Sequence, residues 1–319
     1  VFVAACGDDD KKDSSGSSAT TTQPADSAEL SAEEKAANKI KPVAGAASTS
    51  ITVGSKNFPE QFILGEIYAQ ALDAAGYKVK KDLDLGSELI AYKAVRDGNV
   101  DAYPEYTGTS LTSFFKVKLP DVPKEPQQAY GQARAAYAKV GITALPPTPF
   151  ENTYRMGMTK AGAAKFGNPT KISDLADEAK DMTVNGYPEC RQRTDCLLGV
   201  QQTYGLKFKK FLPGQNPYQT LDNGDADVAF VFTTDGPLAS DKYVVLDDDK
   251  KLFPPYNISF TVRDEVAKKL GPDGQQVVQE VQKYMTEEVM QELNARFSVD
   301  KKKADEIAGD YLKQFGFTS

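Results

Sequence analysis

The sequence predicts an α/β protein with two lobes and a cleft between them. From residue 51 onward, segments typical of strands alternate with segments typical of helices, which is the pattern of an α/β sheet. The chain has 319 residues, enough for two domains of ordinary size. One stretch in each half also follows the same order of features, which indicates two lobes built on one plan.

This internal similarity relates two stretches of eighteen residues. YKAVRDGNVDAYPEYTGT begins at Tyr92 and YQTLDNGDADVAFVFTTD begins at Tyr218. In both, a helix end is followed by a glycine turn, an aspartate, a strand, an aromatic residue and a threonine, and Tyr106 falls opposite Phe232. Ligands of open α/β sheets bind beyond the carboxyl ends of the strands. We therefore expect one of these rings on each side of a cleft that closes on a ligand.

The first lobe is expected to begin with a strand followed by a long helix. Pro59 and Glu60 suit the first turn of that helix, apolar residues recur along one face, and Gly76 can end it. Ser87 can cap a second helix, ELIAYKAVRDG. The strands expected around these helices lie at residues 51–54, 77–86 and 100–103.

The second half repeats this alternation from residue 182. MTVNGY, FKKFLPG and ADVAFVF predict strands, and LLGVQQTYG predicts a helix. In the last part, helices are expected over DEVAKKLG, QQVVQEVQKYMTEEVMQELNARFSV and KKKADEIAGDYLKQFG. We therefore expect lobe 1 to comprise residues 51–152 and 261–319, and lobe 2 to comprise residues 153–260, with hinges near residues 153 and 260.

Residues 1–50 are expected to lie outside both lobes. VFVAACG resembles the end of a lipoprotein signal peptide, in which Cys6 would carry lipid and become the mature N-terminus; a free cysteine is the alternative. Residues 7–50 have the composition of a flexible tether, with a transient helix over residues 29–41. No later segment has the roughly 18 consecutive apolar residues of a membrane span. The pattern predicts a globular body held outside the membrane by a lipid anchor.

The other two cysteines lie close together in CRQRTDC. A disulfide between Cys190 and Cys196 is plausible outside the cytoplasm. On the chain-entropy model, so small a loop stabilises the fold by roughly 2–2.5 kcal/mol. A metal site is the weaker alternative, because the chain has no histidine to complete the coordination.

The composition excludes several functions. Without histidine, no Ser-His-Asp or Cys-His catalytic system and no histidine-liganded metal site can form. The sequence also shows no phosphate-cradling glycine-rich loop and no paired acids, so neither an enzyme nor a cofactor is expected. The formal net charge of -7 argues against a broad basic face for nucleic acid.

Aromatic residues adjoin several predicted strands, in loops that also contain Pro, Gly, Thr or Asn. They are Tyr106, Tyr154, Phe232 and Tyr256. Each ring alone is more typical of a core than of a binding site. As a set without ionic partners they suit a quaternary ammonium, which has no N–H to donate and is held by ring faces at about 0.5–2 kcal/mol each.

Polar residues near these rings could hold an anionic group. Lys56 precedes a helix N-terminus, a position that favours a carboxylate. Arg191 and Arg193 lie between the cysteines, and an arginine can grip a carboxylate by two hydrogen bonds. Thr109 offers a hydroxyl. Solvated surface charges are the alternative for the three cations, and Glu105 is expected to bond to nearby backbone or to a hinge.

Four segments, taken in order, resemble a known family. GSKNFPEQFILGEIYAQAL, AVRDGNVDAYPEYTGT, TTDG and FPPY are similar to the substrate-binding proteins of ABC importers for glycine betaine, choline and related osmoprotectants. The resemblance extends from about Ile51 to the C-terminus. It implies a type II periplasmic-binding-protein-like clamshell, a membrane permease as partner, and a place outside the cytoplasm.

The resemblance also implies roles for the candidate residues. The motifs PEYTGT, NTY and FPPY place Tyr106, Tyr154 and Tyr256 in a box of rings around a trimethylammonium head. Phe232 stands where many members have tyrosine, so it keeps the ring face and loses the hydroxyl.

The same comparison assigns the polar residues to a ligand carboxylate. Lys56 and Thr109 carry over from KNF and PEYTGT, and RTDC favours Arg193 over Arg191. A zwitterion such as glycine betaine or proline betaine is therefore expected, because choline would leave two cations poorly paired. Carnitine, ergothioneine, choline and ordinary amino acids are the alternatives.

Overall fold

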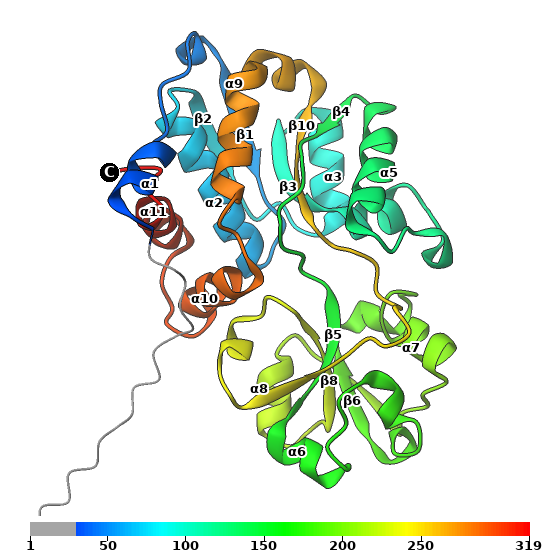
Figure 1. Ribbon diagram of the computed structural model, residues 1–319. Helices are drawn as coiled ribbons and strands as arrows, with labels where there is room; N and C mark the ends of the chain where they lie inside the picture. The colour runs from blue at the N-terminus through cyan, green and yellow to red at the C-terminus, as the bar shows by residue number, and fades with distance from the viewer. Residues whose placement is uncertain (1–29) are drawn as a thin grey trace, which may run out of the picture.

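The computed structural model describes residues 30–319. The predicted lipid attachment site, Cys6, and the first part of the predicted tether lie outside the described residues. The described chain forms two lobes, each built on a five-stranded sheet with helices packed against it (Figure 1). The predicted two-lobed α/β architecture is therefore confirmed.

Lobe 1 contains the sheet with strand order β2-β1-β3-β10-β4. β1 runs parallel to β2 and β3, whereas β10 is antiparallel to both of its neighbours. Its strands are β1 (Ser50–Gly54), β2 (Lys78–Asp82), β3 (Ala102–Tyr106), β4 (Ile142–Ala144) and β10 (Ile258–Arg263). Its main helices are α2 (Pro59–Ala74), α3 (Glu88–Asp97), α5 (Pro126–Ala138), α9 (Asp264–Gln282), α10 (Glu287–Ser298) and α11 (Ala304–Gln314).

Lobe 2 repeats this plan with the strand order β7-β6-β8-β5-β9. β6 is parallel to β7 and β8, and β5 is the antiparallel strand. β3 and β8 hold equivalent places, and Tyr106 and Phe232 are their last residues, as the internal alignment predicts. The strands are β5 (Tyr154–Thr159), β6 (Thr183–Gly186), β7 (Lys210–Pro213), β8 (Val228–Phe232) and β9 (Tyr243–Leu246), and the helices are α6 (Lys160–Lys165), α7 (Leu197–Tyr204) and α8 (Pro217–Asp222).

The chain crosses between the lobes twice, just before β5 and just before β10 (Figure 1). The two crossing segments lie side by side, because Glu151 and Asn257 form an antiparallel bridge and the Asn152 amide donates to the Tyr256 carbonyl over 3.2 Å. β10 begins at Ile258 and belongs to the sheet of lobe 1. This strand therefore extends across the boundary predicted at residue 260.

Helix α2 begins at Pro59, as predicted, and forms the centre of lobe 1. Ile63, Leu64, Ile67 and Leu72 are fully buried. The sequence predicts that only one face of this helix is buried. In the structure more than one face is buried, because α2 contacts three other helices, α9, α10 and α11, as well as the sheet. Polar residues of its first turn, including Glu60 and Gln61, are consequently buried too.

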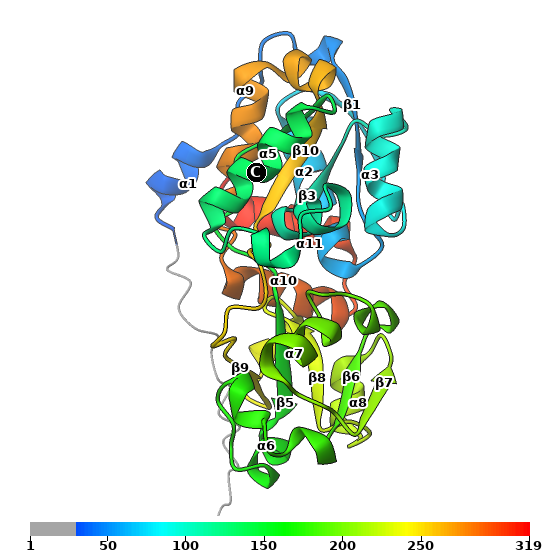
Figure 2. The same cartoon turned by 90° about the vertical axis from the view of Figure 1, so that its right-hand side faces the viewer.

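The prediction of one continuous helix over residues 275–299 is wrong, because the structure divides this segment between α9 and α10. α9 ends at Gln282, and Thr286 caps α10 by accepting a hydrogen bond from the amide of Val289. The break lets α10 lie at the boundary between the lobes, where both views place it (Figures 1 and 2). There it packs against the short η7 helix (Gly236–Ala239) of lobe 2.

Glycine is required at this contact. A Cβ atom on Gly236 would lie 2.5 Å from the backbone of Ala295 in α10. The backbones of the two lobes therefore pack directly against each other here.

A second contact between the lobes involves residues 119–124. Leu119 is buried in the core cluster of lobe 2, and the Lys124 ammonium donates to the Leu252 carbonyl over 3.2 Å. Residues 119–124 thus connect lobe 1 to lobe 2 at a second place.

The prediction of a tether through residue 50 is wrong for residues 30–50. Helix α1 (Ala32–Asn38) begins with a capping box between Ser31 and Glu34. The Asn38 side-chain amide donates to the Phe315 carbonyl over 2.8 Å and to the Tyr284 hydroxyl over 3.0 Å. Three scattered apolar residues, Leu30, Ile40 and Val43, pack against the core of lobe 1. These residues are too widely spaced to give a periodic pattern, so the polar composition of the segment predicts a tether where the structure has a packed segment.

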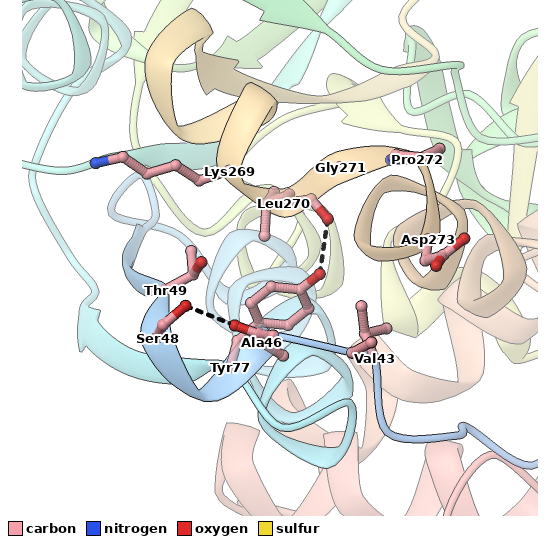
Figure 3. Close-up of a pocket in the computed structure, with 12 residues that line it drawn as sticks. Val43, Ala46, Ser48, Thr49, Tyr77, Lys269, Leu270, Gly271, Pro272 and Asp273 are labelled. Carbon is pink, nitrogen blue, oxygen red and sulfur yellow. Dashed lines mark hydrogen bonds between the residues drawn. The ribbon is translucent and has the colours of Figure 1, made fainter.

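The end of this N-terminal segment borders a surface cavity of about 370 Å³ (Figure 3). Its far wall is the kink of α9, where Gly271 has a φ of 65° and Pro272 follows. The Tyr77 hydroxyl donates to the Leu270 carbonyl over 2.7 Å across the base of the kink. None of the predicted binding residues lines this cavity, so the predicted binding site lies elsewhere.

Candidate ligand-binding site

Three of the four predicted rings lie close together where β5 begins and β8 ends. The ring centroid of Tyr154 lies 4.5 Å from that of Phe232 and 6.4 Å from that of Tyr256. Tyr154 begins β5, Phe232 ends the neighbouring β8, and Tyr256 lies in the second crossing segment. The register that pairs Tyr154 with Phe232 across the two strands explains why their rings touch.

The fourth predicted ring, Tyr106, belongs to lobe 1. It ends β3 and stacks on Phe58, with 6.1 Å between the ring centroids. The turn that follows, Thr107–Thr109, brings the two ring groups together, because a Cβ on Gly108 would lie 2.7 Å from the Tyr256 ring. Thr109, at the end of this turn, is buried. The glycine of PEYTGT therefore lets the turn approach Tyr256.

Lys56 is buried behind Tyr106 and already has an anionic partner. Its ammonium forms an ion pair with Glu105 and lies 4.4 Å from the centroid of the Tyr106 ring. Glu105 also accepts hydrogen bonds from the Tyr103 hydroxyl over 2.9 Å and from the Tyr106 amide over 2.7 Å. Burial raises the pKa of Glu105, and the ammonium of Lys56 acts in the opposite direction. Glu105 thus contacts nearby backbone, as predicted, and it also neutralises Lys56, which the sequence analysis missed.

Arg193 lies beside the ring cluster in lobe 2, whereas Arg191 does not. The guanidinium carbon of Arg193 is 5.5 Å from the Tyr154 ring centroid, while that of Arg191 lies over Phe211. Cys190 and Cys196 form a disulfide and are both fully buried. The disulfide closes the loop that presents Arg193.

Arg193, like Lys56, has an internal partner. Its Nε and Nη2 atoms donate to the two carboxylate oxygens of Asp195 over 2.8 Å and 2.5 Å. The Tyr256 hydroxyl donates to the same carboxylate. Burial acts to raise the pKa of Asp195, but the hydrogen bonds and charge of Arg193 hold it below its usual range.

These pairs remove one argument made from the sequence. Choline was disfavoured because it would leave Lys56 and Arg193 without an anion. In the structure each cation has a buried carboxylate partner, Glu105 and Asp195 respectively. A ligand without a carboxylate therefore leaves neither cation unpaired.

Sequence reasoning missed three residues that adjoin the predicted site. Tyr187 follows β6, and its ring centroid lies 5.9 Å from that of Phe232. The signal was available, because Tyr187 follows a predicted strand as Tyr106 does. Gln61 accepts a hydrogen bond from the Lys56 amide, and its buried Nε2 has no partner among the described residues. Glu60 accepts a hydrogen bond from the Tyr106 hydroxyl. Nothing in the local sequence around Glu60 or Gln61 indicates these contacts.

Asp235 orders the turn that holds Phe232. Its carboxylate accepts hydrogen bonds from the Phe232 amide and the Tyr218 hydroxyl, each over 2.9 Å. Burial raises the pKa of Asp235 to about 7, and the charge of Glu60 acts in the same direction. The aspartate therefore retains a proton in the folded protein at pH values where it loses the proton in the unfolded chain.

The comparisons with known proteins agree with this architecture. The family model described as the substrate-binding domain of ABC-type glycine betaine transport systems matches residues 49–314. This chain belongs to that family. Its members are solute-binding proteins of ABC importers and not enzymes, so the chain is an extracytoplasmic component with a membrane permease as partner and a small molecule as ligand.

Individual relatives resemble most of the chain. A glycine-betaine-binding protein of Pseudomonas aeruginosa is 32% identical over 282 residues, which cover 84% of this chain and 89% of that protein. A glycine betaine-binding protein of Escherichia coli is 29% identical and covers 85% of this chain and 92% of its own. A crystal structure of a glycine betaine/carnitine/choline ABC transporter protein has a TM-score of 0.72 at 26% identity, covering 83% of this chain and 99% of its own.

The proton held by Asp235 should make stability depend on pH. The pKa of Asp235 is raised in the folded state, so the bound proton stabilises the fold. This contribution to the free energy of unfolding is complete below the unfolded pKa near 4 and is lost as pH rises through about 7. The loss should amount to about 1.4 kcal/mol per pKa unit of difference. Urea unfolding of the wild type and Asp235→Asn between pH 4 and pH 8 measures it.

Asp235→Asn should remove this part of the pH dependence, because an asparagine is neutral throughout. Asp225→Asn, an exposed position in the turn before β8, is the matched control and should follow the wild type. Identical pH profiles for Asp235→Asn and the wild type would contradict the assignment.

Proposed function

We propose that the protein captures a small quaternary ammonium solute between its lobes and delivers it to an ABC permease. The observation that carries this proposal is the gathering of rings where the equivalent strands β3 and β8 end: Tyr106 on one side, and Tyr154, Phe232 and Tyr256 on the other. A quaternary ammonium has no hydrogen-bond donor, so it is recognised by ring faces and methyl contacts.

The polar groups at this site support a ligand with an acceptor at its other end. The Nε2 of Gln61 is a buried donor without a hydrogen-bond partner among the described residues, and buried donors are normally hydrogen-bonded. Arg193 has further N–H donors beyond the two that bind Asp195. We propose glycine betaine as the first candidate, with Lys56, Thr109 and Arg193 at the carboxylate end and the four rings around the ammonium.

The names of the relatives extend the range of candidates. Besides the glycine betaine-binding proteins, the matches include an ergothioneine transport protein of Helicobacter pylori and a carnitine transport binding protein of Listeria monocytogenes. All three molecules carry a trimethylammonium group and a carboxylate. Choline, which lacks the carboxylate, is the second candidate, because the internal pairing of Lys56 and Arg193 removes the objection to it.

Titration calorimetry of the chain with glycine betaine, choline, carnitine, ergothioneine and a panel of amino acids tests the ligand class. We expect binding of at least one trimethylammonium compound and no heat from ordinary amino acids, whose primary ammonium needs hydrogen-bond acceptors. Tight binding of an amino acid with none of the trimethylammonium compounds would disprove the proposal.

The ring assignments can be tested separately. Tyr106→Ala and Tyr256→Ala should each weaken binding by roughly tenfold or more, since each removes a cation–π contact in a water-excluded site. Tyr243→Ala, which removes a ring elsewhere in lobe 2, is the control and should bind as the wild type does. Unchanged affinity in both site variants would mean that the ligand binds elsewhere.

We also propose that lipid on Cys6 holds the protein at the outer face of the membrane, on the strength of the sequence VAAC. Within residues 30–319, no helix is long and apolar enough to cross a bilayer. Cys6→Ser removes the proposed lipid and should move the protein from the membrane fraction to the soluble fraction, with ligand affinity unchanged. Retention of the variant in the membrane fraction would rule the anchor out.

A further inference from the structure

Three buried carboxylates contact the rings or the cations of the proposed site, and they differ in their partners. Glu105 is paired with Lys56, and Asp195 is paired with Arg193. Glu60 is also buried, yet among residues 30–319 its recorded partners are all uncharged. The nearby ammonium of Lys56, 4.4 Å from the Tyr106 ring centroid, is paired with Glu105. Within the described residues, Glu60 is therefore the carboxylate of this group that forms no ion pair.

The partners of Glu60 come from both lobes and from a crossing segment. Its Oε1 accepts hydrogen bonds from the Tyr106 hydroxyl over 2.7 Å and from the Asn152 side chain over 2.8 Å. Its Oε2 accepts from the Asn294 side chain over 2.9 Å and from the Thr234 hydroxyl. Four donors thus occupy the acceptor sites of one carboxylate, and they hold it in a single orientation.

The position of Glu60 in the chain also favours negative charge. It is the second residue of α2, directly after Pro59, and the N-terminus of a helix carries a partial positive charge. Neutral hydrogen-bond donors and a helix N-terminus stabilise a carboxylate without cancelling its field at longer range. In a buried site of low effective dielectric constant, that field reaches neighbouring groups more strongly than it would in water.

The hydrogen bond to Tyr106 links this carboxylate to one ring of the proposed site. Tyr106 is the ring that lobe 1 contributes to the proposed cage, and its hydroxyl points to Glu60. A phenol that donates to a carboxylate gains electron density in its ring, and the ring face attracts cations through that density. The carboxylate therefore both orients the ring and makes its face more attractive to a positive charge.

We propose that Glu60 is a positioning residue that makes the site prefer a cationic head group over a neutral group of the same shape, and that it acts through Tyr106. This inference rests on the proposed function. The rival role for Glu60 is purely structural, as a junction that joins the lobes through Thr234 and Asn294. That role predicts an equal loss of affinity for charged and neutral ligands.

The test compares each ligand with its tert-butyl analogue, in which a neutral carbon replaces the ammonium nitrogen. The probes are glycine betaine and choline, each with its analogue, and the measurement is the ratio of the two dissociation constants. Glu60→Gln should reduce the preference for the cation by roughly tenfold or more, because it removes a unit charge close to the head group. Tyr106→Phe, which keeps the ring and removes the hydroxyl, should reduce it in the same direction by a smaller factor.

Thr234→Val is the matched control. It removes one donor to Glu60 from lobe 2 but leaves the charge and the bond to Tyr106, so the ratio should stay at the wild-type value even if stability falls. An unchanged ratio in Glu60→Gln overturns the inference. If that variant does not fold, an unchanged ratio in Tyr106→Phe overturns it instead. A wild type that binds none of glycine betaine, choline, carnitine and ergothioneine overturns the proposed function, and the inference with it.

Discussion

The arrangement of the aromatic residues at the predicted site depends on how the buried charges next to them are paired. Removing a carboxylate or an ammonium from water is costly unless the protein supplies partners. The side chains of Lys56, Glu105 and Asp195 are at most 5% exposed, and that of Arg193 is 22% exposed. Each pair also holds an aromatic residue: Glu105 accepts from the Tyr106 amide, and Asp195 accepts from the Tyr256 hydroxyl. The hydrogen bonds that satisfy these carboxylates therefore also help to fix the positions of Tyr106 and Tyr256.

Much of the architecture was predictable because its signals are local. Strand–helix alternation, Pro59 at a helix start and the repeated helix–glycine–aspartate–strand order each lie within a short stretch of chain. The equivalence of Tyr106 and Phe232 followed from that order, and the structure places both at the ends of equivalent strands. The disulfide was predictable for the same reason, because its two cysteines lie close together in the sequence. The likeness to a family favoured Arg193 over Arg191, and the structure places Arg193 beside the Tyr154 ring.

The features that the sequence did not reveal depend on contacts between distant residues. Lys56 and Glu105 are 49 positions apart, and Glu60 and Thr234 are 174 positions apart. No local pattern marks such a pair, so Lys56 appeared free to bind a ligand and Glu60 appeared to be an ordinary first-turn acid. Residues 30–50 were misread for a related reason. Their few apolar residues are too widely spaced to suggest a core, and they become part of one only where lobe 1 provides the other half.

The docking of residues 30–49 has a mechanical consequence. This segment packs on lobe 1 next to the C-terminal residues, through the bond from Asn38 to Phe315 and the bond from the Ile40 amide to the Phe317 carbonyl. Any pull transmitted along the chain from residue 30 is therefore borne by lobe 1, whose core these contacts join. Lobe 2 is joined to lobe 1 at other places, through the two crossing segments and through the contact of η7 with α10.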